Sequence, residues 1–211
     1  MTDVISAQPS RTVGIVLFDG FELLDAFGPV EILSVLPKHF RLSFISTNAR
    51  TVQSSQGVCV IADTTIADAE PVDILIVPGG IGIERLVADQ RALGALRALA
   101  ETAEIVASVC TGTAALAIAG ILDGRAATSN KKAFDWVRSF GPNVDWKPRA
   151  RWVTDAKFWT ASGVAAGMDM TAALIRHLHG DETAQYATEM IELEVRTDPH
   201  DDPFAIVSPQ T

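Results

Sequence analysis

The chain has 211 residues, of which 48% are hydrophobic and 20% are charged, so it is long enough to bury a substantial core. Its formal net charge of −9 argues against a nucleic-acid-binding protein, because phosphate backbones are bound by clustered Lys and Arg. No apolar run approaches the roughly 20 residues of a membrane span, and residues 1–12 lack the order of a signal peptide. We therefore expect one globular domain over residues 1–211, with a core over about 12–196, in the cytoplasm.

The basic residues form no stripe along the sequence. Lys131 and Lys132 are adjacent, and Lys147, Arg149 and Arg151 alternate with other residues. Both patterns are typical of solvated surface charge, and we predict a surface position for all five side chains.

Strand-like and helix-like segments alternate in chain order. Apolar runs predict strands at residues 13–18, 40–46, 58–62, 73–77 and 104–109, and helical spacing predicts helices at 24–36, 93–101, 111–119, 165–178 and 182–194. A short hairpin is expected from 151–153 and 157–160. Continuously apolar strands are typical of parallel sheets covered on both faces. The pattern therefore predicts an α/β fold, a three-layer αβα sandwich with a flavodoxin-like, mostly parallel sheet, which binds ligands beyond the carboxyl ends of its strands.

Cys110 lies where the strand at 104–109 stops and the next helix starts at once, followed by Thr111-Gly112. A sharp strand-to-helix turn exposes a nucleophile at the sheet edge, and the free N–H groups and dipole of the helix favour a thiolate. The alternative is a small buried hydrophobe at a strand end. The second cysteine, Cys59, lies in an alternating strand and is interpreted as structural, with both thiols free in a reducing compartment.

Two further turns end at the same edge as Cys110. Asp25 stands in the first helix among apolar residues, which would raise its pKa and suit it to exchange a proton with sulfur; Glu22 is the competing acid. The alternative for Asp25 is a first-turn carboxylate. Gly79 and Gly80 offer backbone N–H groups that, with the N–H of Thr111, would form an anion or oxyanion hole, although a plain turn explains them equally.

No metal or cofactor is predicted. His177 and His179 are two residues apart on one helix, which suits neither a zinc pair nor a shared base, so both are placed on the surface. The acidic tail at 197–211 is interpreted as loosely docked or ordered by a partner subunit, and its Asp and His residues fit a mobile tail better than a metal site. A dinucleotide fingerprint fails because Arg85 stands where the third glycine belongs.

From about residue 13 to 195 the chain resembles the ThiJ/PfpI superfamily, whose fold is related to class I glutamine amidotransferases, and five motifs carry this resemblance. They are Leu24-Asp25-Ala26-Phe27-Gly28-Pro29, Ile76-Val77-Pro78-Gly79-Gly80, Ser108-Val109-Cys110-Thr111-Gly112, residues 119–128 and residues 162–169. Within the superfamily, an aspartate before Gly-Pro together with Cys-Thr-Gly is most similar to the isocyanide (isonitrile) hydratases.

This resemblance implies a cysteine-dependent hydro-lyase that converts isocyanides to N-substituted formamides. Cys110 would be the nucleophile, Asp25 the proton donor and acceptor, and Thr111 would orient charge and water. The substrate-binding group would comprise Gly79, Gly80, Asn130 and Gly163. It further implies a small electrophilic substrate and a homodimer.

Three alternatives stay open. A low-pKa Cys110 would also serve an oxidation sensor or ligand-binding module without turnover. Glyoxalase, deglycase or amidase chemistry is possible for the superfamily, but many relatives carry a histidine where this chain has Asn130. The same motifs resemble the amino-terminal domains of AraC-type regulators, yet no helix-turn-helix segment follows here.

Overall fold

A seven-stranded sheet forms the centre of the protein, whose structure is a computed structural model that describes residues 10–205. The strand order is β10-β11-β7-β6-β1-β2-β5, and every neighbouring pair is parallel except β10 with β11. The bounds are β1 (Arg11–Leu17), β2 (Phe40–Ser46), β5 (Thr64–Thr65), β6 (Ile74–Val77), β7 (Ile105–Val109), β10 (Trp152–Asp155) and β11 (Phe158–Ala161).

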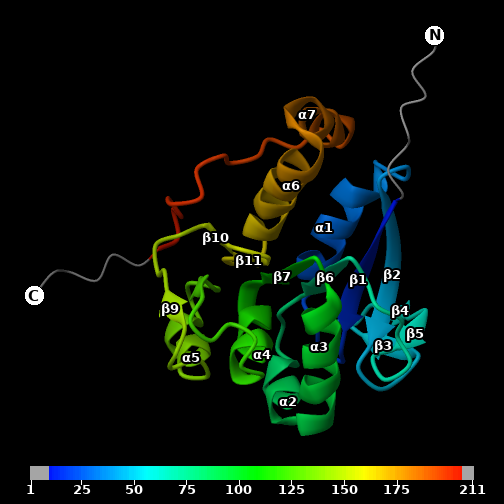
Figure 1. The fold of residues 1–211 in the computed structure, drawn as a ribbon, viewed down its shortest axis with the longest axis vertical. Coiled ribbons are helices and arrows are strands. Elements are labelled where there is room, and N and C mark those ends of the chain that lie inside the picture. The colour runs from blue at the N-terminus through cyan, green and yellow to red at the C-terminus, as the bar shows by residue number, and fades with distance from the viewer. Residues whose placement is uncertain (1–9, 206–211) are drawn as a thin grey trace, which may run out of the picture.

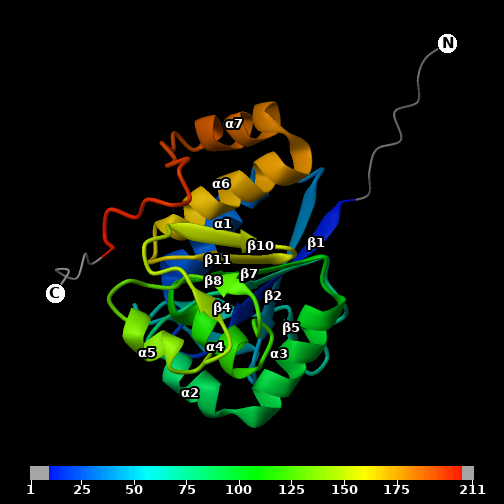
Figure 2. The ribbon, with the colours of Figure 1, turned by 60° about the vertical axis from the view of Figure 1, so that its left-hand side comes forward.

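Helices cover both faces of this sheet. One layer holds α1 (Leu23–Ser34), α6 (Ala166–His179) and α7 (Asp181–Met190), and the other holds α2 (Ile83–Ala88), α3 (Gln90–Thr102) and α4 (Thr113–Ile118) (Figures 1 and 2). The smaller elements are β3 (Thr51–Gln53), β4 (Cys59–Ile61), β8 (Ala126–Ala127), α5 (Phe134–Arg138) and β9 (Asp145–Trp146). The predicted three-layer α/β sandwich with a mostly parallel sheet is confirmed.

The buried strands β6 and β7 explain why the site forms where it does. Every residue of both strands is buried, as their continuous apolar runs require, and Val77 lies beside Ser108 in the register. The segments that follow these strands, and the one that follows β1, therefore leave the sheet at a common edge.

Within residues 10–205, no helix is both long enough and apolar enough to cross a membrane.

Most element predictions agree with the structure to within a few residues. The strand at 40–46 is reproduced in full, and the predicted hairpin is the antiparallel pair β10 and β11. The third helix starts at Gln90 rather than residue 93, because Oδ1 of Asp89 accepts the N–H groups of Arg91 and Ala92, both at 3.0 Å. The predicted helix at 111–119 instead opens with a 3-10 turn, Cys110–Gly112, before α4.

The prediction of surface charge is wrong for Lys131 and Arg151. Lys131 is 7% exposed, and its Nζ donates to Oγ1 of Thr128 at 2.7 Å and to the carbonyl of Ala150 at 2.5 Å. Burial lowers the pKa of Lys131 to about 8. Arg151 is 4% exposed and pairs with the carboxylates of Asp169 and Asp202. Charge patterning could not reveal either position, because the carbonyl of Ala150 that Lys131 binds and the carboxylates that pair with Arg151 are distant in sequence.

Three smaller expectations also change. His179 is half-buried rather than on the surface: its ring lies 4.2 Å from that of His39, and its Nε2 accepts or donates no hydrogen bond among the described residues. Cys59 is exposed, so it does not fill the core. The tail is docked as far as Ala205, with Asp202 buried, and residues 206–211 of the predicted tail lie outside the described part.

Candidate active site

Cys110 occupies a strained turn at the carboxyl end of β7. Its φ is 59°, in the left-handed region that a non-glycine residue seldom adopts. Two hydrogen bonds hold this conformation: the Cys110 N–H donates to the carbonyl of Ser162 at 2.8 Å, and the Cys110 carbonyl accepts from Oγ of Ser129 at 2.7 Å. Gly112 permits the turn, because a Cβ there would collide with the backbone oxygens of Val77 and Pro78. The predicted strand-to-helix elbow is thus present.

Asp25 is fully buried in the first turn of α1. Its Oδ2 accepts the N–H of Gly79 at 2.9 Å, while its Oδ1 has no hydrogen-bond partner among residues 10–205. Burial raises the pKa of Asp25 to about 7, with a further increase from the charge of Glu22, although Gly79 and the nearby thiol of Cys110 act in the opposite direction. A carboxyl with this pKa can both accept and donate a proton near neutral pH.

The thiol of Cys110 differs from the prediction of a thiolate stabilised by the helix. Burial raises the pKa of Cys110 to about 12, and the charge of Asp25 adds to the increase. The N–H of Thr111 and the amide of Asn130 favour the thiolate, but they do not compensate for a side chain that is only 7% exposed. The turn supplies one N–H and a short helix, so the resting sulfur is protonated, and a thiolate forms only as a base removes its proton.

The predicted anion hole at Gly79 and Gly80 is also different in the structure. The Gly79 N–H is bonded to Asp25, and the Gly80 N–H donates to Oγ1 of Thr111 at 3.1 Å, so neither group is free to bind substrate. A Cβ on Gly79 would lie 2.5 Å from Oγ1 and 2.6 Å from N of Thr111. The two glycines instead let the turn after β6 approach Thr111 and Asp25 closely.

Asn130 enters the site, and its orientation follows from its hydrogen bonds. Oδ1 of Asn130 accepts the N–H groups of Lys132 at 2.9 Å and Ala133 at 3.1 Å. The amide nitrogen must then face the other way, towards Cys110 and Gly163, and a Cβ on Gly163 would lie 2.7 Å from it. Asn130 therefore presents to the sulfur an amide N–H donor, which does not titrate.

Sequence reasoning missed Ser129 and Ser162, which fix the backbone of Cys110. Ser162 opens one of the motifs that carried the family resemblance and Ser129 directly follows another, but no spacing rule connects either residue to the cysteine, which lies 52 and 19 positions away. Thr113 was missed because one of its partners, Thr128, is 15 positions away. Its buried Oγ1 lies 2.9 Å from Oγ of Ser108 and donates to the carbonyl of Thr128 at 3.1 Å. Among the described residues no group of three His, Cys, Asp or Glu side chains is arranged to hold a metal ion.

The close contact at Gly79 gives a test of this geometry. We expect Gly79→Ala to lower the free energy of unfolding by about 1–3 kcal/mol, because the added methyl group overpacks the contact between Thr111 and Asp25. Urea unfolding measures the change. Gly94→Ala is the matched control: it lies inside α3 with no atom within 4 Å of the new Cβ, and should stabilise by up to about 1 kcal/mol. Equal effects of the two substitutions would contradict the proposed packing.

The comparison with protein families identifies the family to which the chain belongs. The model of the DJ-1/PfpI family matches residues 11–177, which span the sheet, the elbow and most of α6. The chain belongs to the DJ-1/PfpI family. It is 34% identical over 199 residues to an isonitrile hydratase of Pseudomonas putida, covering 94% of this chain and 83% of that protein.

Other members of the family have different functions. The chain is 32% identical over 189 residues to the HTH-type transcriptional regulator GbdR of Pseudomonas aeruginosa, covering 87% of this chain but only 51% of the regulator, about half its length. It is 32% identical over 120 residues to a deglycase of Pyrococcus horikoshii, covering 56% of this chain and 70% of that protein. Family membership alone therefore leaves the reaction open.

Solved structures agree on the fold. A ThiJ/PfpI family protein from Pseudomonas syringae superimposes with a TM-score of 0.82 at 24% identity, covering 98% of this chain and 82% of that one. Drosophila melanogaster DJ-1beta superimposes with a TM-score of 0.77 at 19% identity, covering 88% of this chain and 99% of that one.

Proposed function

We propose that this protein hydrates isocyanides to N-substituted formamides, with Cys110 as nucleophile and Asp25 as proton donor and acceptor. The observation that supports this best is the buried carboxyl of Asp25, with a pKa of about 7, beside the thiol on the strained elbow. The similarity to an isonitrile hydratase over 94% of the chain is independent support.

The reaction follows from an isocyanide carbon that accepts both a nucleophile and a proton. Asp25 takes the proton of the Cys110 thiol and delivers it to the terminal carbon while sulfur forms a bond to the same carbon, which gives a thioimidate. Water then adds to that carbon, with its proton passing through Asp25 to nitrogen. Cleavage of the carbon–sulfur bond releases the N-substituted formamide, and the sulfur regains its proton. The overall change is the addition of one water molecule.

Two groups assist these steps. The hydroxyl of Thr111 accepts the N–H of Gly80, so its own proton is directed elsewhere and is available to the water. The amide nitrogen of Asn130 donates towards the sulfur and stabilises negative charge as the proton leaves. Because Gly79 and Gly163 have no side chain, Thr111 and Asn130 can lie close to their backbones, where a Cβ would collide with them.

The test is direct. Purified protein is incubated with cyclohexyl isocyanide, and the loss of the isocyanide infrared band and the appearance of the formamide are followed. We expect catalytic turnover that Cys110→Ala abolishes, whereas Cys59→Ala, which removes the exposed thiol, leaves it unchanged. Formamide production at the wild-type rate by the Cys110→Ala variant would refute the proposed roles.

A non-catalytic role is the second candidate, because the chain is also similar to a transcriptional regulator over 87% of its length. In that case no isocyanide would be turned over. Mild peroxide followed by intact mass tests an oxidation sensor, which the burial and raised pKa of Cys110 disfavour relative to a ligand-binding module. Methylglyoxal as substrate tests glyoxalase or deglycase chemistry, which we do not favour because Asn130 cannot act as a base.

We further propose a cytoplasmic homodimer formed by one 211-residue domain. The exposed apolar side chains of Leu24 and Ile81, 41% and 77% accessible, adjoin the segments that carry Asp25 and Gly80 and would be covered by a second copy. Sedimentation equilibrium at several concentrations tests the dimer, and a monomer at all of them would rule it out.

A further inference from the structure

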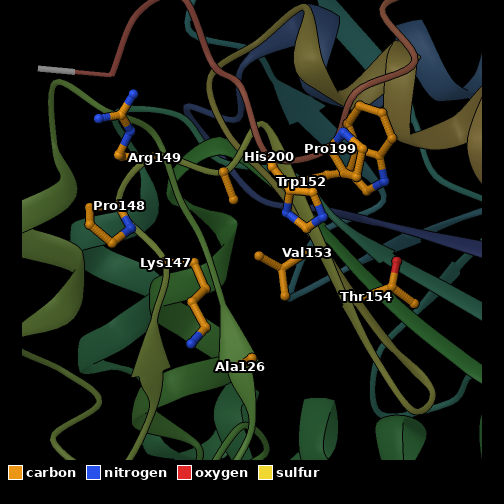
Figure 3. Close-up of a pocket in the computed structure, with 10 residues that line it drawn as sticks. Ala126, Lys147, Pro148, Arg149, Trp152, Val153, Thr154, Pro199 and His200 are labelled. Atoms are coloured by element: carbon orange, nitrogen blue, oxygen red, sulfur yellow. The ribbon is translucent and has the colours of Figure 1, made fainter.

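The segment after α7 returns to the sheet and docks at its β10 edge. Figures 1 and 2 show residues 196–205, in red, leaving the layer of α6 and α7 and passing the β10 edge. The N–H of Arg196 donates to Oδ1 of Asp169 at 2.9 Å, and the N–H of Arg151 donates to the carbonyl of Pro199 at 2.8 Å. In Figure 3, Pro199 and His200 of this segment lie against Trp152 and Val153, in a pocket formed with β10 and residues 147–150.

A buried ionic contact fastens the segment. Asp202 is 4% exposed, and its Oδ1 lies 3.6 Å from the guanidinium of Arg151, whose Nε also donates to Oδ2 of Asp169 at 2.6 Å. Oδ2 of Asp202 has no hydrogen-bond partner within residues 10–205. Burying a carboxylate with one oxygen unsatisfied is costly. A side chain that only closed the surface would be apolar, so this arrangement calls for a specific role.

A chain of backbone hydrogen bonds connects the segment to the nucleophile. The carbonyl of Pro199 accepts from Arg151, the carbonyl of Arg151 accepts from Ser162, and the carbonyl of Ser162 accepts from Cys110, each at 2.8 Å. The last bond is one of the two that hold Cys110 at a φ of 59°. A strained conformation persists only where the surrounding structure fixes it. The position of Arg151 is therefore transmitted to the elbow.

We propose that Asp202 is a positioning residue for Cys110: it docks residues 196–205 onto Arg151, and through Ser162 this docking holds the buried elbow in place. The inference concerns the thiol itself and does not depend on which reaction the protein catalyses. If the docking fails, the hydrogen bond from the Cys110 N–H to the carbonyl of Ser162 weakens and the sulfur becomes accessible to water.

The experiment measures alkylation of Cys110 by iodoacetamide, in a Cys59→Ser background that removes the exposed thiol. We expect Asp202→Ala to increase the alkylation rate at pH 8 at least about tenfold, because hydration of the sulfur moves its pH profile towards that of an ordinary thiol. The groups that face the sulfur, namely Asp25, Asn130 and the Thr111 N–H, are unchanged in this variant. Asp201→Ala removes the neighbouring exposed carboxylate and should leave the rate within twofold of the parent, as surface substitutions do.

A second control separates positioning from general loss of stability. Leu93→Ala leaves a cavity under α3, on the other face of the sheet, and should lower the melting temperature without changing the alkylation profile well below the transition. If Asp202→Ala does not fold, Asp202→Asn decides. The amide keeps an oxygen for the Phe204 N–H, which favours folding, but it loses the negative charge that attracts Arg151. We then expect the alkylation rate to rise at least about threefold. An alkylation profile in folded Asp202 variants equal to that of Asp201→Ala would overturn the proposal.

Discussion

Replacing Asp25 with asparagine is expected to lower kcat/KM for isocyanide hydration by about 10²–10⁴-fold, the usual contribution of a positioned acid or base. The amide keeps an oxygen for the N–H of Gly79, so the turn after β6 is preserved. It cannot accept the proton of Cys110, whose pKa of about 12 leaves the sulfur protonated without a base. Steady-state rates between pH 5 and 9 measure the loss. Glu31→Gln, on the exposed side of the same helix, is the control and should retain full activity.

The same substitution should stabilise the fold, and the effect has a definite pH dependence. Burial raises the pKa of Asp25 from 3.8 to about 7, so the native state holds a proton that the unfolded chain has released. The contribution of Asp25 to stability is therefore fully present below about pH 4 and is lost as pH rises through about 7. We expect the free energy of unfolding of Asp25→Asn, relative to that of the wild type, to increase by up to about 4 kcal/mol as pH rises over this range. Above this range the difference between the two proteins should be constant.

Urea unfolding of both proteins at several pH values from 4 to 9 checks this difference. Other titrating groups are common to the two proteins and cancel in the comparison. A variant that loses activity and gains no stability as pH rises would mean that the carboxyl of Asp25 is not kept protonated by burial. The catalytic role and the pKa are thus tested by independent measurements on a single substitution.

The fold could be predicted from the sequence because its decisive signals are local. The apolar runs of β6 and β7 are typical of central strands in a parallel sheet, and the abrupt change from strand to helix at Cys110 marks the elbow without reference to any other segment. Asp25 was predictable for a related reason, since an acid among apolar residues at a helix start indicates a buried carboxyl.

What could not be predicted depends on contacts between distant segments. The N–H groups of Gly79 and Gly80 are present as expected, but their partners are the side chains of Asp25 and Thr111, 54 and 31 residues away. The protonation of Cys110 likewise reflects its burial, which no local pattern reports. Lys131 and Arg151 have the same explanation: a charged side chain is recognised as internal only when the oxygen atoms that bind it are known.

Arg151 is a buried cation that directly precedes β10. Its guanidinium lies between two carboxylates, Asp169 and Asp202, and all three side chains are at most 6% exposed. Arg151→Leu removes the cation and leaves both anions buried, so we expect the free energy of unfolding to fall by about 3–5 kcal/mol at pH 7. Arg151→Lys should recover only part of this loss, because a single ammonium group cannot reproduce the contacts of the planar fork.

An exposed pair of the same chemistry provides the comparison. Arg176 and Asp181 lie 2.7 Å apart with side chains 40% and 87% exposed, and Arg176→Leu should cost no more than about 1 kcal/mol, since water replaces the lost partner. Urea unfolding of the three variants measures the contrast. If the two leucine variants lost the same stability, the carboxylates around Arg151 would have to be hydrated, and residues 196–205 could not be docked on the sheet as the structure places them.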